Sequence, residues 1–307
     1  MTPSVDRAPN PGRQSFARAA DSFARFWISI LALAALVILA GIASFLFQNS
    51  LQALQKIGLF QMVGKADWFP TSANALFGFL PAEVGSIWVT TVALVLSMPL
   101  GVLAAIYLSE FANPRVKEVG KTIIEFMAAV PSVVFGLMGM TILVPLVARA
   151  FDLSSGLCGL TAGLCVGMVC LPTVISISED AMHAVPDELR QGALALGNNR
   201  WQMVYKVILP AASSGIFAAI MLGLGRAIGE TMVVLMVSGN AGIIPQSPLL
   251  AARTMTGTIA QETGEVVRGG LHFSVLFVMG LVLFVVTFAI NLVADVVLEI
   301  QRKRWRR

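Results

Sequence analysis

Six blocks of mainly apolar residues, each close to the length that crosses a lipid bilayer, dominate this sequence. A membrane-spanning helix needs about 20 consecutive apolar residues. Only 12% of the 307 residues are charged, against roughly 25% in a typical soluble domain. We therefore predict an all-α polytopic membrane protein with six transmembrane helices, at Phe26–Phe47, Gly85–Leu108, Val133–Ala148, Leu157–Ile177, Ala211–Ser238 and Phe273–Ala294. The third block is short unless its helix begins earlier, near Ile123.

The distribution of Lys and Arg predicts the orientation of these helices. If the N-terminus is cytoplasmic, fifteen Lys and Arg residues fall in inside segments, five fall in outside segments, and Arg226 lies within a span. Cytoplasmic loops carry such an excess, so we expect both termini in the cytoplasm. The terminal run RKRWRR is also typical of nucleic-acid binding. Because it directly follows an apolar span, we interpret it as a membrane anchor and predict no nucleic-acid partner.

The ends of the spans divide the chain into five parts. They are a flexible cytoplasmic arm at 1–25, the first transmembrane helix at 26–47, an outside loop at 48–84, a membrane core at 85–297 and a basic cytoplasmic tail at 298–307. The first span exceeds the apolar region of a signal peptide, which is about 7–15 residues, so we expect it to be retained.

Two outside segments are long enough to have structure of their own. In the first, Trp68 and Phe69 either lie at the membrane interface, where aromatic rings are favoured, or pack the loop onto the membrane core, which we prefer. The second, residues 239–272, is either a docking surface for an external partner or a partly re-entrant loop.

The cysteines and histidines indicate neither a disulfide nor a metal site. Cys158, Cys165 and Cys170 follow one another along the fourth span, where the helical rise separates neighbours by roughly 7–10 Å along the axis. That separation is too large for a disulfide without distortion, so we interpret them as packing residues. His183 and His272 lie on opposite sides of the membrane, away from any cluster with metal-ligand spacing. We predict no metal and no cofactor.

One short stretch imitates the end of a nucleotide-binding loop. Gly120-Lys121-Thr122 matches the last part of G-x-x-x-x-G-K-[ST], but Arg115 occupies the position of the first glycine. Such a loop joins a strand to a helix, and no strand is predicted before it. We expect no ATP site in this chain.

The inside loop at 178–210 reads as two short helices joined by a turn. Pro186 followed by Asp187 and Glu188 is a favourable helix start, because Pro is tolerated in the first turn and acids favour the positive end of the helix dipole. Gly197-Asn198-Asn199 predicts a helix end and a turn. A second helix is expected from Arg200 to Pro210, where the fifth span starts.

This loop resembles the cytoplasmic loop of ABC-importer permeases, which carries Glu-Ala-Ala, three residues, Gly, nine residues and Ile-x-Leu-Pro. The corresponding positions here hold Gln191, Gly192, Ala193, Gly197, Val207, Leu209 and Pro210. Gln191 and Gly192 depart from the pattern, which removes its acidic first residue, and Glu188 is a nearby substitute. The alternative is an ordinary loop helix. The resemblance implies that Ala193, Gly197, Leu209 and Pro210 couple the membrane core to an ATPase.

Residues 80–297 are similar, more specifically, to the PstC-type permeases of phosphate-specific ABC importers. The resemblance rests on AIYLSEFANPRVKEVGK, PSVVFGLMG, GALALGNNRW and ILPAASSGIFAAIMLGLGRAIGETMVV. It implies a type I importer permease fold in the bacterial inner membrane that moves phosphate inward by alternating access. It also implies three partners, which are a sister PstA-like permease, a cytoplasmic PstB-like ATPase dimer and a periplasmic PstS-like phosphate-binding protein.

Arg226 and Glu230 stand near the middle of the fifth apolar block. A charge at the centre of a membrane helix costs roughly 2.5–3.5 kcal/mol, so both need partners. Four residues apart on one helix, they would share a face and pair, and Gly225-x-x-x-Gly229 permits close helix packing. They either form a structural ion pair or serve a transport path. In the second interpretation, which we prefer, Arg226 attracts an anion, Glu230 tunes that attraction, and Thr231 contributes a hydroxyl.

Three other functions remain open from the sequence. A permease for another oxyanion, such as sulfate or molybdate, would have a similar cytoplasmic loop. A secondary transporter or channel would need no ATPase, but it is expected to show inverted repeats and broken spans in both halves, which we do not find. A structural membrane subunit would have no path at all.

Overall fold

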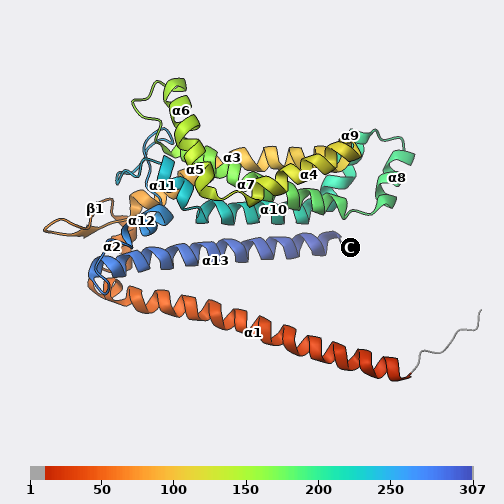
Figure 1. Cartoon of the computed structure of the whole chain (residues 1–307), viewed down its shortest axis with the longest axis horizontal. Coiled ribbons are helices and arrows are strands. Elements are labelled where there is room, and N and C mark those ends of the chain that lie inside the picture. The colour runs from red at the N-terminus through yellow and green to blue at the C-terminus, as the bar shows by residue number, and fades with distance from the viewer. Residues whose placement is uncertain (1–10, 306–307) are drawn as a thin grey trace, which may run out of the picture.

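Three long helices lie side by side and form the centre of the membrane core (Figure 1). The computed structural model describes residues 11–305, and describes the side chains of residues 23–299. The central helices are α3 (Leu80–Ile106), α7 (Gly159–His183) and α10 (Leu209–Gly229). Within the described residues, six helical stretches are long and apolar enough to cross a membrane, which confirms the predicted number of spans.

Helix α7 is the most buried of these elements, because small residues allow α3 to approach it closely. A side-chain carbon added at Gly163 would lie 2.4 Å from Cβ of Val92, and one added at Gly167 would lie 2.9 Å from a methyl of Leu96. Small residues one turn apart are the usual means of close packing between membrane helices. The three cysteines of the fourth block are buried and unpaired, as predicted.

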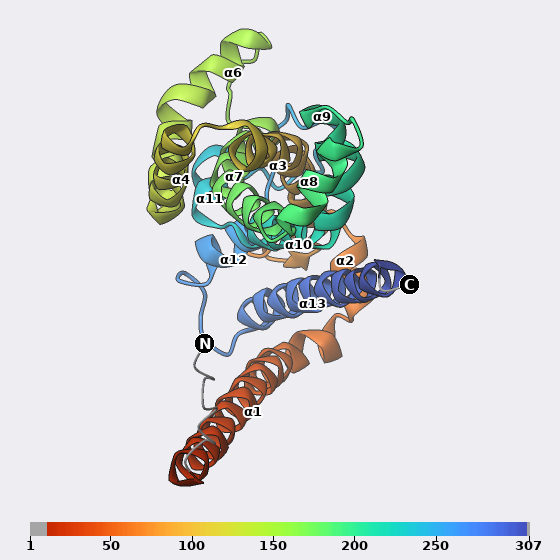
Figure 2. The same ribbon diagram turned by 90° about the vertical axis from the view of Figure 1, so that its right-hand side faces the viewer.

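Of two further long helices, α13 (Leu271–Trp305) lies beside this centre, and α1 (Pro11–Lys56) packs against part of α13 and diverges from it (Figures 1 and 2). Helix α1 is joined by α2 (Leu59–Gly64) to the outer end of the core, and α13 returns along α10. Helix α1 begins at Pro11, so residues 11–25 of the expected flexible arm are helical. Residues 1–10 of that arm and Arg306 and Arg307 of the tail lie outside the described residues.

The third apolar block is not one straight helix. It consists of α5 (Ser132–Met138), a π-helical turn (Gly139–Leu143) and α6 (Val144–Ala150), and α4 (Pro114–Ala129) precedes it along α7. The chain is extended at Val130 and Pro131, because proline disfavours helical backbone in the residue before it. In both views α6 turns away from the bundle.

The two outside segments pack against each other at one end of the bundle. The first forms an antiparallel hairpin of β1 (Trp68–Phe69) and β2 (Leu76–Phe77), and the second contains α12 (Met255–Glu262). The Trp68 side chain is 7% exposed and its indole nitrogen donates to Glu262 at 3.0 Å. The preferred packing role is therefore confirmed for Trp68, whereas Phe69 is 58% exposed and does not share it.

The fifth apolar block is interrupted. A short helix, α9 (Arg200–Met203), continues through a π-helical turn (Val204–Ile208) into α10, which ends at Gly229. Glu230 then has extended backbone, with φ −68° and ψ 129°, and α11 (Met232–Val237) follows. The prediction of one continuous helix from Ala211 to Ser238 is wrong, because other groups bind the backbone at this break.

Candidate functional site: a broken membrane helix and the loop beneath it

The Glu230 carboxylate binds the backbone at the start of α11. Its Oε1 accepts hydrogen bonds from the backbone N–H of Thr231 at 3.2 Å and of Val233 at 3.4 Å. The backbone carbonyl of Glu230 accepts a hydrogen bond from the Thr256 hydroxyl at 2.8 Å. Broken helices occur inside membrane proteins where other groups satisfy the freed backbone. Here Glu230 and Thr256 do so.

Arg226 lies on the last turn of α10 and is exposed in this chain. Its guanidinium Nη1 donates to the hydroxyl of Thr173, on α7, at 3.3 Å. None of the ion pairs formed among the described side chains involves Arg226. The expected ion pair with Glu230 is therefore absent, because the backbone break ends their common helix face and the backbone N–H groups bind the carboxylate instead.

An exposed arginine in an apolar helix needs protein or water beside it, not lipid. Gly225 and Gly229 flank Arg226, and neither has another atom within 4 Å of an added side-chain carbon. The surface at Gly225 and Gly229, next to Arg226, is thus open. Most of the remaining donors of its guanidinium are available to a ligand, and arginine can bind phosphate-like oxyanions with two parallel hydrogen bonds.

A small polar cavity lies beside Glu230. It is lined by Ser86 and Thr90 of α3, and by Thr254 and Thr256 near the start of α12. The Ser86 hydroxyl accepts a hydrogen bond from the backbone N–H of Met255 at 3.0 Å.

Of the three predicted pathway residues, Thr231 lies at the break, and its hydroxyl donates to the Gly229 carbonyl at 3.2 Å. Thr173 and Thr256 could not be identified from the sequence, because their positions beside Arg226 and Glu230 follow only from packing.

The inside loop has the predicted helix–turn–helix form. Helix α8 (Asp187–Ala195) follows Pro186, and Gly197 has φ +84°, a conformation that favours glycine. Asn199 caps α9 through a hydrogen bond from the backbone N–H of Gln202 at 2.8 Å. Leu209 and Pro210 form the first turn of α10.

Most of α8 faces outward. Ala193 is its one buried residue, at 5% exposure, whereas Leu189 and Leu194 are 47% and 45% exposed. Leu196, directly after the helix, is 85% exposed. Exposed apolar residues on a surface loop are typical of a protein–protein contact. Gln191 and Gly192, the two departures from the permease pattern, are also exposed on this helix.

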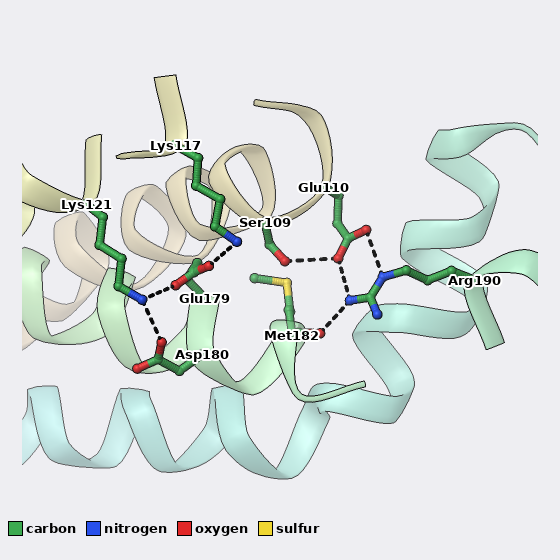
Figure 3. Close-up of polar contacts among 8 residues, drawn as sticks. All are labelled: Ser109, Glu110, Lys117, Lys121, Glu179, Asp180, Met182 and Arg190. Atoms are coloured by element: carbon green, nitrogen blue, oxygen red, sulfur yellow. Dashed lines mark hydrogen bonds and ion pairs between the residues drawn. The ribbon is translucent and has the colours of Figure 1, made fainter. Parts of the chain in front are cut away.

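Six charged residues form ion pairs that join α4 to α7, and α8 to the turn that ends α3 (Figure 3). We call them the cytoplasmic charge cluster, and they are Glu110, Lys117, Lys121, Glu179, Asp180 and Arg190. Lys117 lies 2.8 Å from the carboxylate of Glu179, and Lys121 lies 3.1 Å from Glu179 and 3.1 Å from Asp180. Lys121, the residue of the apparent nucleotide-binding motif, is thus engaged with acids of α7.

Arg190 joins three elements. Its Nη2 and Nε donate to the two carboxylate oxygens of Glu110, at 3.0 and 3.4 Å, and Glu110 lies in the π-helical turn (Tyr107–Phe111) that ends α3. The same guanidinium donates to the carbonyls of Met182, at 2.7 Å, and Val185. The hydrogen bonds from Arg190 to Glu110 raise the pKa of the guanidinium, so it stays charged.

Comparisons with known proteins identify the family. Residues 97–307 match the family described as "Binding-protein-dependent transport system inner membrane component". The chain is 36% identical to the "Probable ABC transporter permease protein YqgH" of Bacillus subtilis, over 86% of each chain. It is 35% identical to the "Phosphate transport system permease protein PstC" of Mesorhizobium japonicum, covering 86% of this chain and 85% of the relative.

Solved structures agree on the fold. A bacterial ABC transporter that imports the acidic polysaccharide alginate aligns with 93% of this chain at a TM-score of 0.61 and 16% identity. The methionine ABC transporter MetNI, in an inward-facing form, aligns with 73% of this chain at a TM-score of 0.54 and 18% identity. These identities support the fold alone.

The chain belongs to the family of binding-protein-dependent transport system inner membrane components. It is therefore a multi-pass inner-membrane permease subunit of an ABC importer, and not an enzyme.

Proposed function

We propose that this chain is a permease subunit of an ATP-driven importer of inorganic phosphate. The observation that carries the proposal is the Arg226 guanidinium, which is exposed on the broken fifth span and has no carboxylate partner among the described side chains. The names of PstC relatives that are 30–35% identical over most of the chain support phosphate as the solute.

In this proposal Arg226 contacts the passing anion, while Glu230 and Thr231 shape the break beside it. A single fixed positive charge attracts phosphate without holding it in a closed cage, and transport requires binding that is weak enough to allow release. Glu230 limits the attraction by placing a negative charge near the path. Its bonds to the start of α11 keep that charge in place.

The proposed partners follow from the surfaces of the chain. A sister permease covers the open face around Gly225 and Arg226, and a periplasmic phosphate-binding protein delivers the solute. A cytoplasmic ATPase dimer contacts the exposed side of α8. Ala193, Gly197, Leu209 and Pro210 fix the shape of this coupling loop and transmit its motion to α10.

The solute is tested by uptake competition. The chain is produced with its cognate partner subunits in cells that lack their own high-affinity phosphate importer, and uptake of labelled phosphate is measured with excess sulfate or molybdate. We expect ATP-dependent phosphate uptake that neither competitor reduces. An assembled complex that imports labelled sulfate or molybdate and no phosphate would overturn the proposed solute.

A further inference from the structure

Helix α3 connects the two candidate sites that lie at opposite ends of the core. Near its start, Ser86 and Thr90 line the cavity beside Glu230. At its end, Glu110 binds Arg190 of α8. From Ser86 to Glu110 the helix and its terminal turn extend roughly 36 Å at the usual helical rise.

The contact between Glu110 and Arg190 is a partly buried ion pair with two hydrogen bonds. The side chain of Glu110 is 5% exposed and that of Arg190 is 16% exposed. Two N–H groups of one guanidinium bind the two oxygens of one carboxylate, a geometry that fixes orientation as well as distance. The Ser109 hydroxyl donates to the same carboxylate at 3.0 Å and helps to hold it.

Helix α8 has other attachments besides this ion pair, among them Ala193, which is buried in an apolar cluster with Ala105 and Ile106 of α3. The chain joins α8 to α7 through residues 184–186, and Arg190 also binds the carbonyls of Met182 and Val185 at the end of α7. The loop through Gly197 joins α8 to α9 and α10. The Arg190 contact with Glu110 is the direct polar bond from α8 to α3 among the described side chains.

We propose that the Glu110–Arg190 ion pair is the link through which α8 and α3 move together. This inference rests on the proposed function, in which α8 receives the motion of an ATPase. Displacement of α8 then shifts α3 along its length, and with it Ser86 and Thr90 beside Glu230. Glu110 and Arg190 are positioning residues, because they act through α3 and do not contact the solute.

Coupling between two sites is reciprocal, so the link also carries the signal from the outer face to the ATPase. The test uses the purified complex in lipid vesicles with its cognate periplasmic binding protein. ATP hydrolysis is measured with and without that protein, in the presence of phosphate and, in a parallel arm, of sulfate. Glu110→Gln keeps the shape of the side chain and removes its charge.

We expect Glu110→Gln to leave basal hydrolysis unchanged and to reduce stimulation by the binding protein about five-fold or more, the lower end of typical coupling effects. Glu110→Asp keeps the charge and should restore part of the stimulation. Asp187→Asn is the matched control, because Asp187 binds the same guanidinium at 3.1 Å but is 81% exposed. Stimulation of ATP hydrolysis by the binding protein should be the same in Asp187→Asn as in the wild type.

A double variant tests whether the two residues act as one unit, because the effects of substituting two coupled residues do not add. Glu110→Gln should cause no further loss of stimulated ATP hydrolysis in a complex that already carries Arg190→Gln. The stimulation of the Arg190→Lys complex should lie between those of Arg190→Gln and the wild type, because lysine keeps the charge but lacks the planar, two-pronged guanidinium. Losses of stimulation that add in the double variant, or normal stimulation with Glu110→Gln, would overturn the link. So would a wild-type complex whose hydrolysis ignores its binding protein.

Different results would contradict the proposed solute and the proposed link. If the wild-type complex shows stimulated hydrolysis but takes up no labelled phosphate, the proposed solute is wrong, and the ratio of stimulated to basal hydrolysis still measures the link. If phosphate uptake is normal and Glu110→Gln leaves the stimulation unchanged, the solute stands and the link is wrong.

Discussion

Arg226 and Glu230 have opposite charges and separate tasks. Glu230 stabilises the start of α11 through backbone hydrogen bonds, while Arg226 lies on the exposed side of α10 and, among the described side chains, donates a hydrogen bond to Thr173. Had the two paired, the carboxylate would offset the charge of Arg226, and the guanidinium would attract an anion only weakly. The break at Glu230 therefore explains how an arginine remains available within an apolar span.

We predict that Glu230→Ala lowers the stability of the folded chain. Two backbone N–H groups of α11 would lose their acceptor, and loss of a comparable helix cap costs about 1 kcal/mol. Thermal unfolding of the purified complex should therefore occur at a lower temperature for this variant. Glu230→Gln retains an acceptor oxygen and should stay closer to the wild type, and equal unfolding temperatures for all three proteins would contradict the capping role.

The individual charged residues could be predicted from sequence more easily than their partners. Arg226 and Glu230 stand out because charges are rare in apolar spans. The helix break that separates the two side chains depends on the Thr256 hydroxyl, which lies 26 residues after Glu230 in the sequence. Glu110 and Arg190 are 80 residues apart, and the one sequence signal for Glu110 was an acid at the cytoplasmic end of an apolar helix.

At the scale of elements, ion pairs tie the first part of α4 to the end of α7. Within α4 no residue is buried, yet Lys117 and Lys121 both reach acids near the end of α7. The two lysines are four residues apart and so share one face of their helix. This attachment holds the cytoplasmic ends of α4 and α7 together beside α8.

The Lys121 contact predicts a dependence of stability on alkaline pH. Hydrogen bonds to Asp180, and then to Glu179, raise the pKa of Lys121 above its ordinary value of 10.5. A raised pKa stabilises the fold fully below the ordinary value, and the stabilisation disappears as pH rises through the raised value. Lys121→Gln should therefore lower the unfolding temperature at pH 8, and the difference from wild type should vanish in strong alkali.

Arg115→Gln is the control for that measurement, because Arg115 is exposed on the same helix. Its unfolding temperature should match the wild type at pH 8. If Lys121→Gln also matches the wild type at pH 8, the ion pairs of Lys121 contribute nothing to stability. Solvent screening makes the expected difference small, because the side chain of Lys121 is 43% exposed.

Local signals explain which elements could be predicted. Helix α8, its turn and α9 follow from Pro186, Gly197 and Asn199, which act on their own neighbours. The bend after α5 and the break at Glu230 could not be predicted, because apolar composition is the same in a straight and in an interrupted span. Tertiary contacts decide between the two, as Thr256 does at Glu230.

At the scale of the whole molecule, the chain presents a face that needs a partner. Gly225, Gly229 and exposed Arg226 lie together on α10, and lipid is an unfavourable neighbour for a charge. The number of spans and their orientation were predictable from apolar blocks and positive charges. The face on which a second subunit packs was not, because it depends on which side of α10 the core covers.

We predict that Gly225→Leu impairs assembly without preventing insertion of the chain. The Cβ of a leucine there would meet nothing within 4 Å in its own chain, but the side chain would obstruct a closely packed partner at a cost of roughly 1–3 kcal/mol. Recovery of the sister permease with the tagged chain should fall about five-fold or more. Gly264→Leu, at another open position, is the control, and unchanged recovery with Gly225→Leu would place the sister subunit elsewhere.

The central claim is that Arg226 contacts the transported anion, and phosphate uptake by assembled Arg226 variants tests it most directly. Hydrogen bonds to charged groups contribute about 1.5–3 kcal/mol, so Arg226→Gln should reduce uptake about ten- to hundred-fold. Arg226→Lys should retain part of it, and Arg149→Gln, an exposed arginine on α6, should retain all. Wild-type uptake with Arg226→Gln would contradict the account and leave Arg226 a structural role.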